Sequence, residues 1–208
     1  MMVIKSDIPD HYDNIDRIYE LIWKLLDLGK RDTNSPFHQA YLATHNENFP
    51  SIRTIVLRNV NLKDKALSFH TDYRSNKINE IVKNDKISIL FYDHDKKIQI
   101  KCSGKALINN KNENSNESWL NTMPFSKKCY IVDKPPGSLS DQPTSGFKKE
   151  YEIDMPDEEI LNYGYENFTL VKMEILEIEW LYLYRYGHRR AKFSINNKEL
   201  EKKVWLTP

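Results

Sequence analysis

The sequence predicts a mainly β fold, in which antiparallel strands close into a barrel with a few flanking helices. Six or more segments of strand length carry β-branched and aromatic residues. In residues 97–108, apolar and polar positions alternate, which is typical of a strand with one buried face. Because polar turns separate the segments and few of them show helical spacing, a closed barrel is favoured over an open sheet.

The first element expected is an amphipathic helix over residues 10–28. Apolar side chains recur there at helical spacing, and Gly29 is a plausible stop. Such a face more often packs on a core than binds a partner. Shorter helices are expected over residues 75–83, 115–123 and 126–133. Asp72 or Ser75 could cap the first of these.

The strands are expected to follow the helix and to continue almost to the C-terminus. Their predicted spans are residues 37–44, 50–60, 66–71, 87–92, 97–108, 168–184 and 190–195. Residues 134–144 contain Pro135-Pro136-Gly137 and predict a loop, and the fold of residues 134–165 as a whole is left open. No internal repeat is visible, so residues 1–208 are expected to form a single domain.

Composition argues against several classes of partner. The chain has 31 basic and 30 acidic residues and a net charge of +1, so no global field favours nucleic acid or an anionic membrane. Cys102 and Cys129 form neither a metal-binding spacing nor a disulfide framework, and are expected to be reduced thiols. The N-terminus lacks the apolar core of a signal peptide, and no run reaches membrane-spanning length. A cytoplasmic protein without a metal site is therefore expected.

Cationic and hydroxyl side chains gather where the second and third strands lead into a short helix. Arg53 and Arg58 lie on one strand, and Ser75 and Lys77 open the helix. Charge-assisted hydrogen bonds and a helix N-terminus both favour an anion. Five residues apart, the two arginines point to opposite faces of a regular strand, so one ligand reaches both only through a bulge, a strand end or a site between subunits. We expect a phosphate-bearing cofactor here; the alternative is solvated surface charge.

The order of these residues resembles the pyridoxamine 5'-phosphate oxidase family of FMN-binding split barrels, from about residue 37 to residue 208. The motifs that carry the resemblance are Arg53-Thr54-Ile55-Val56-Leu57-Arg58, Phe69-His70-Thr71-Asp72, Arg74-Ser75-Asn76-Lys77, Gln99, Gly104-Lys105-Ala106, Trp180, His188-Arg189-Arg190-Ala191-Lys192-Phe193 and Trp205-Leu206-Thr207-Pro208. The basic cluster is similar to that of a broader FMN-binding branch rather than the strict vitamin B6 enzymes. The resemblance implies a split β-barrel of antiparallel strands with flanking helices, FMN as cofactor, and a homodimer with flavins at its interface.

The resemblance also implies which residues contact FMN. They are Arg53, Thr54, Ile55, Val56, Leu57, Arg58, His70, Thr71, Ser75, Asn76, Lys77, Gln99, Trp180 and Lys192. Arg53 would bind the phosphate, Gln99 the polar edge of the flavin ring, and Lys192 would reach FMN from the other subunit. Each has a simpler alternative: a lone histidine such as His70 is more often structural, and a tryptophan in an apolar strand such as Trp180 is usually core.

The implied substrate contacts are Arg58, Trp119, Ser126, His188 and Arg190. Met123 stands where the vitamin B6 enzymes of the family carry an arginine for the substrate phosphate. In addition, Trp119 replaces a tyrosine, and the residue types at His188 and Arg190 are exchanged. These departures leave the cofactor site recognisable and the substrate site open.

The expected function is an FMN-dependent oxidoreductase that oxidises a small anionic amine or alcohol with O2 as acceptor. Pyridoxamine or pyridoxine 5'-phosphate, or a related compound, would be the substrate implied by the resemblance. In such enzymes the flavin carries the chemistry, so no side chain needs to be a nucleophile, and no catalytic residue is assigned. Three alternatives remain: flavin chemistry on another small molecule, a non-catalytic FMN-binding protein for storage or sensing, and an interaction domain without a cofactor.

Overall fold

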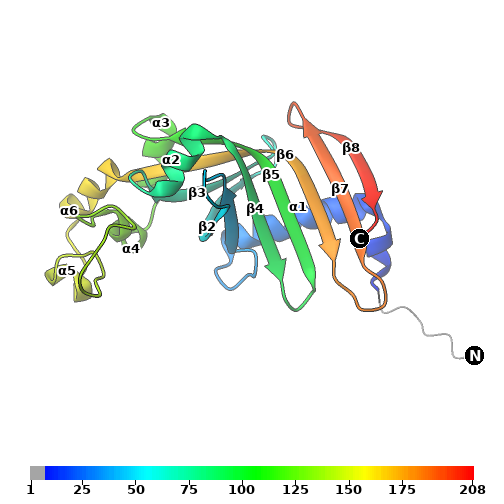
Figure 1. The fold of residues 1–208 in the computed structure, drawn as a ribbon, viewed down its shortest axis with the longest axis horizontal. Helices are drawn as coiled ribbons and strands as arrows, with labels where there is room; N and C mark the ends of the chain where they lie inside the picture. Colours follow the sequence, from blue (N-terminus) through cyan, green and yellow to red (C-terminus); the bar gives the residue numbers. More distant parts are fainter. Residues whose placement is uncertain (1–7) are drawn as a thin grey trace, which may run out of the picture.

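Six antiparallel strands close into a barrel in the computed structural model, which describes residues 8–208 (Figure 1). Their order is β3-β2-β1-β4-β5-β6, and the barrel closes because β6 also pairs with β3. The strands are β1 (Gln39–Thr44), β2 (Ser51–Asn61), β3 (Ala66–Asp72), β4 (Lys86–Asp93), β5 (Ile98–Asn109) and β6 (Phe168–Tyr182). Two more, β7 (Arg189–Asn196) and β8 (Glu199–Leu206), extend the sheet beyond β6. The predicted barrel of antiparallel strands is confirmed.

Strand β6 belongs both to the barrel and to the extension. Its N-terminal half pairs with β3, its C-terminal half pairs with β7, and β5 accompanies it along almost its whole length. The β5–β6 register shifts between Ser103 and Gly104, and a Cβ atom on Gly104 would lie 1.9 Å from the carbonyl oxygen of Glu174. Only glycine permits this close approach of two backbones.

Helix α1 (Ile15–Arg31) places its apolar face against the main core. Ile18, Ile22 and Leu26 are fully buried there, and burying each side chain contributes roughly 1.5–3 kcal/mol. The expected stop at Gly29 is wrong, because the helix continues to Arg31. A Cβ atom on Gly29 would lie 2.4 Å from the carbonyl oxygen of Phe37, so this glycine serves close packing and not termination.

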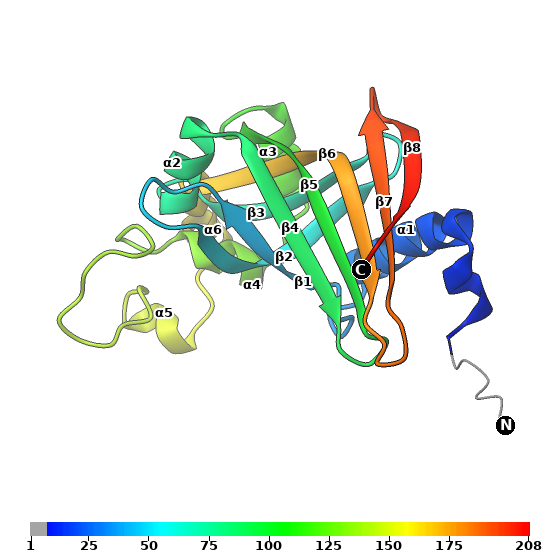
Figure 2. The ribbon, with the colours of Figure 1, turned by 45° about the vertical axis from the view of Figure 1, so that its right-hand side comes forward.

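The long segment that connects β5 to β6 lies at one end of the barrel (Figure 2). It contains α3 (Glu113–Leu120), α4 (Pro124–Lys127), α5 (Glu150–Ile153) and α6 (Glu158–Tyr163), with short 3-10 turns. A second, smaller core anchors it, in which Trp119 and Tyr130 pack on Phe168 of β6. The segment that the sequence left open therefore contains two short helices, and α5 projects away from the barrel.

Other expectations differ from the structure in detail. Helix α3 ends at Leu120 instead of Met123, and α2 (Asn76–Lys83) begins one residue later than predicted. Strand β8 was not predicted, because none of its side chains is fully buried and its sequence shows no clear apolar alternation. No helix among residues 8–208 is long and apolar enough to cross a membrane.

Candidate functional site

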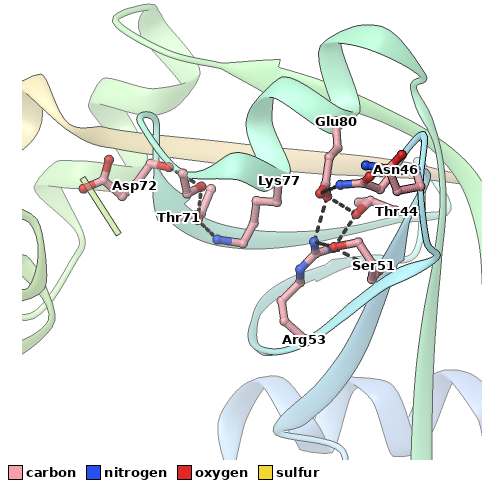
Figure 3. Close-up of polar contacts among 10 residues, drawn as sticks. Thr44, Asn46, Ser51, Arg53, Thr71, Asp72, Lys77 and Glu80 are labelled. Atoms are coloured by element: carbon pink, nitrogen blue, oxygen red, sulfur yellow. Dashed lines mark hydrogen bonds and ion pairs between the residues drawn. The ribbon is translucent and has the colours of Figure 1, made fainter. Parts of the chain in front are cut away.

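A polar cluster lies where β1, β2 and α2 meet (Figure 3), and Arg53 is at its centre. The guanidinium group donates hydrogen bonds to the hydroxyl groups of Thr44 and Ser51 and to the carbonyl oxygen of Ser51. Its Nη2 lies 2.7 Å from Oε2 of Glu80. These contacts fix the position of the Arg53 side chain, and Glu80 partly neutralises its positive charge.

Glu80 is the counter-charge of this cluster and is almost fully buried, with 9% of its side chain exposed. Burial by itself raises the pKa of a carboxylate, but hydrogen bonds from Thr44, Asn46 and Arg53 outweigh it and lower the pKa of Glu80 to about 2. Glu80 is therefore ionised at neutral pH. Sequence reasoning missed it, because a single glutamate in a short surface helix carries no distinctive signal.

Lys77 supplies the positive charge that this cluster does not neutralise. Its Nζ donates a hydrogen bond of 2.9 Å to Oγ1 of Thr71, and Figure 3 shows the side chain beside Arg53 with its ammonium group directed towards Thr71. Within residues 8–208, no ion pair involves Lys77. Burial and the positive charge of Arg53 lower the pKa of Lys77, which means that its charged form is under-stabilised. An anion bound between Lys77 and Arg53 would relieve this.

The start of α2 also suits an anion. Ser75 occupies the N-cap position, but its hydroxyl donates to the carbonyl oxygen of Asp72, and no side chain caps the helix. The first N–H groups of a helix have no partner within the helix, so an uncapped end leaves them available to an anion. Asn76 is exposed at this end. Arg53, Ser75 and Lys77, which were predicted to neutralise a phosphate, thus fit a phosphate group, and Thr71, predicted as a flavin contact, lies beside Lys77.

Arg58 lies elsewhere, in a cleft of about 680 Å³ between the β2–β3–β6 surface and helices α3 and α4. The β2–β3 register shifts between Leu57 and Asn59, so Arg58 sits at a bulge. His70, Met123 and Ser126 line the same cleft. The structure therefore groups Arg53 with Lys77, and Arg58 with the predicted substrate contact Ser126.

Three other predicted contacts share the outer face of the sheet extension. Gln99 is half-buried on β5, with Tyr92 and Leu181 as its cross-strand neighbours. Arg190 on β7 pairs with Glu179 at 2.7 Å, and Lys192 pairs with Glu177. Both basic residues already have carboxylate partners within one chain.

Several predicted residues face the interior. Trp180 is fully buried and packs edge-on against Tyr12, with their ring centroids 5.2 Å apart. It lies on the other face of the sheet from Gln99, whose cross-strand neighbour on β6 is Leu181. This is the core position that a tryptophan in an apolar strand usually takes. Trp119 is 3% exposed, and its Nε1 donates to Asn162 at 3.4 Å. Neither side chain presents a surface to a ligand within one chain.

The segment 53–58 alternates between the two faces of β2. The side chains of Ile55 and Leu57 are buried in the core, Thr54 is exposed and Val56 half-buried on the outer face. Any ligand contact from Ile55 and Leu57 would therefore come from their backbone. His188 is exposed at the end of the β6–β7 turn, where its Nδ1 accepts a hydrogen bond from the N–H of Tyr184 at 2.9 Å.

Comparison with known proteins gives a consistent picture. Residues 22–110 match the family model of the pyridoxamine 5'-phosphate oxidase FMN-binding domain. A stretch of 75 residues, 36% of the chain, is 31% identical to a pyridoxine/pyridoxamine 5'-phosphate oxidase of Psychrobacter cryohalolentis. That match spans 34% of the length of the Psychrobacter protein.

Two solved structures share the fold over almost the whole chain. A pyridoxamine 5'-phosphate oxidase-related, FMN binding protein from Nostoc punctiforme PCC 73102 is 19% identical, with a TM-score of 0.71 over 91% of this chain and 96% of that one. PhzG from Burkholderia lata 383, solved with tetrahydrophenazine-1-carboxylic acid, is 18% identical, with a TM-score of 0.68 over 98% of each chain. The resemblance to the pyridoxamine 5'-phosphate oxidase-like family of FMN-binding proteins that the sequence predicted is thereby confirmed.

Proposed function

We propose that this protein binds FMN and oxidises a small anionic amine or alcohol, with O2 as the electron acceptor. The observation that carries the proposal is Lys77, a partly buried cation without an ion pair within residues 8–208, which lies near the positive charge of Arg53 at an uncapped helix end. A phosphate group provides the missing negative charge. The match of residues 22–110 to an FMN-binding domain supports FMN as the molecule that carries this phosphate.

Each remaining residue has a defined part in this proposal. Bound FMN supplies a hydride acceptor, and the protein supplies binding, orientation and electrostatics. Arg53, Lys77 and Thr71 would hold the phosphate, and the amide of Gln99 would hydrogen-bond the polar edge of the flavin ring. Arg58 and Ser126 would hold the anionic group of the substrate in their cleft.

The proposed active form is a homodimer. Arg53 lies in the same alternation as the core-facing Ile55 and Leu57, whereas Gln99 and Lys192 lie on the outer face of the sheet. One chain therefore does not bring all of these side chains to one ligand, whereas a dimer could do so if the outer face of one copy packed beside the Arg53 cluster of the other. The same face exposes Ile52, with 66% of its surface accessible. A protein that sediments as a monomer while holding FMN stoichiometrically would contradict this arrangement.

A second candidate function is FMN binding without catalysis. It is favoured by the pairing of Arg190 with Glu179 and of Lys192 with Glu177, since both cations are already neutralised within the chain. Bleaching of the flavin on anaerobic addition of pyridoxamine 5'-phosphate would exclude the non-catalytic candidate, because only an oxidoreductase transfers electrons from a substrate to its flavin.

The phosphate assignment is tested by titrating the flavin-free protein with FMN and with riboflavin. FMN should bind more tightly, and Arg53→Ala and Lys77→Ala should each weaken FMN binding by roughly 1.5–3 kcal/mol. Riboflavin binding should be nearly unchanged in Lys77→Ala. Equal affinities for the two flavins in the wild-type protein would refute the assignment.

A further inference from the structure

The cleft that contains Arg58 holds one cation with no partner. Three basic residues line it, and two of them are neutralised: Lys30 lies 3.6 Å from Asp27, and Lys172 lies 3.0 Å from Asp64. No hydrogen bond or ion pair within residues 8–208 engages the guanidinium of Arg58. Of the arginine and lysine residues that line the cleft, Arg58 is therefore the one without a carboxylate partner among residues 8–208, and the cleft wall also carries the carboxylate of Glu117.

A single guanidinium suits a carboxylate better than a phosphate ester. The two N–H groups on one edge of arginine match the two oxygens of a carboxylate, and the charges of +1 and −1 cancel. A phosphate monoester carries a charge between about −1.5 and −2 at neutral pH and needs a second cation. Met123, 71% exposed at the same cleft, cannot provide one.

His70 adds a hydrogen-bonding group without adding charge. Its Nε2 lies 2.7 Å from Oγ of Ser118 on α3, and its ring packs edge-on against Phe168 at 4.8 Å. Burial, with a further contribution from the positive charge of Arg58, lowers the pKa of His70 to about 3, so the ring is neutral near neutral pH.

The second ring nitrogen of His70 has no partner. Nδ1 is buried and makes no hydrogen bond within residues 8–208. An unsatisfied buried polar atom is destabilising, and a ligand that hydrogen-bonds to it would offset this cost. Because Ser118 holds Nε2, it fixes the orientation of the ring, and Nδ1 is the ring nitrogen without a hydrogen bond among residues 8–208.

We propose that this cleft selects a substrate with a single carboxylate, which Arg58 binds, and that Ser118 positions His70 to hydrogen-bond an uncharged polar group beside that carboxylate. The proposal rests on the function proposed above and narrows its anionic substrate to the carboxylate class. Arg58 and His70 are then the residues that determine specificity, and Ser118 is a positioning residue.

The charge preference is tested with two probes of similar shape, benzoate and phenyl phosphate, titrated into the FMN-loaded protein and followed by ligand-observed NMR. Benzoate should bind about tenfold more tightly than phenyl phosphate, and Arg58→Gln should abolish this preference. Lys172→Gln is the matched control, because it removes a charge from the same cleft that already has a partner. Equal binding of both probes, tighter binding of phenyl phosphate, or no binding of either would overturn the proposal.

The role of His70 is tested with meta-hydroxybenzoate, which adds one hydroxyl group to benzoate. That hydroxyl should improve affinity about three- to tenfold in the wild-type protein and not in His70→Phe. Ser118→Ala should also remove the gain and shift the ¹⁵N resonances of the His70 ring, and Ser118→Thr should restore both. A gain that persists in Ser118→Ala would refute the positioning role.

The proposed function, which requires FMN binding, and the carboxylate preference of the cleft can be refuted separately. All the cleft residues belong to one chain, so the comparison of probes can be repeated in flavin-free protein. Loss of FMN binding with a retained preference for benzoate would refute the proposed function alone. Normal FMN binding without that preference would refute the carboxylate assignment alone.

Discussion

Replacing Glu80 by glutamine should destabilise the protein by about 2–3 kcal/mol at neutral pH. In the folded protein, hydrogen bonds from Thr44, Asn46 and Arg53 outweigh burial and bring the pKa of Glu80 from its ordinary value of 4.5 to about 2. At about 1.4 kcal/mol for each factor of ten, this difference corresponds to an upper bound of about 3 kcal/mol. Glutamine keeps the shape of the side chain but leaves the partly buried Arg53 without its counter-charge.

Urea unfolding of both proteins over a series of pH values measures this contribution. Because the folded pKa of Glu80 lies below the unfolded one, the stabilisation is fully present above about pH 4.5 and is lost as the pH falls towards 2. The stability difference between the wild-type protein and Glu80→Gln should therefore shrink on acidification. Glu47→Gln is the control, since its pair with Lys83 is exposed and should contribute little to stability. A difference that is absent at neutral pH, or constant across the range, would refute the reasoning.

Three further predictions concern the barrel, the cleft and the dimer. Gly104→Ala should lower the free energy of unfolding by more than about 2 kcal/mol, because its Cβ would lie 1.9 Å from a backbone carbonyl oxygen. Gly137→Ala, which is strained only by a φ of +89°, should lower it by about 1 kcal/mol, and thermal unfolding measures both. Met123→Arg should strengthen binding of pyridoxamine 5'-phosphate about tenfold by direct titration, and no change would place residue 123 away from the ligand. Ile52→Arg should shift a sedimentation profile from dimer towards monomer, because it charges the outer sheet face; an unchanged profile would exclude this face as the interface.

The sequence predicted the strands well where one of their faces is buried. The alternation of Ile98, Ile100 and Cys102 with polar residues identified β5, because burial on one side imposes a period of two. The same reasoning failed for β8, which has no fully buried side chain and hence no alternation to detect. It also misjudged Gly29, because a glycine that stops a helix and one that permits close packing look the same in sequence.

In the candidate site too, residues close together in the sequence were predicted, whereas partners far apart in the sequence were missed. Arg53, Ser75 and Lys77 were recognised from local residue order, since an anion site at a helix start combines cations and hydroxyl groups within a short segment. Glu80, the partner of Arg53, and Ser118, the hydrogen-bond partner of His70, were not predicted. Glu80 lies 27 residues from Arg53, and Ser118 lies 48 residues from His70, so nothing in sequence order links either pair.

The sequence by itself determined the class of fold and the resemblance to FMN-binding proteins, and it predicted Arg53 and Lys77 as the cations of a phosphate site, because each depends on residue type and near-neighbour spacing. Only the tertiary structure decided which cations are free. Arg53, Arg190 and Lys192 have carboxylate partners, whereas Arg58 and Lys77 have none among residues 8–208. The tertiary structure also placed Trp180 in the core and Gln99 outside. Charge neutralisation depends on distances between segments far apart in the chain, and those distances exist only after the barrel has closed.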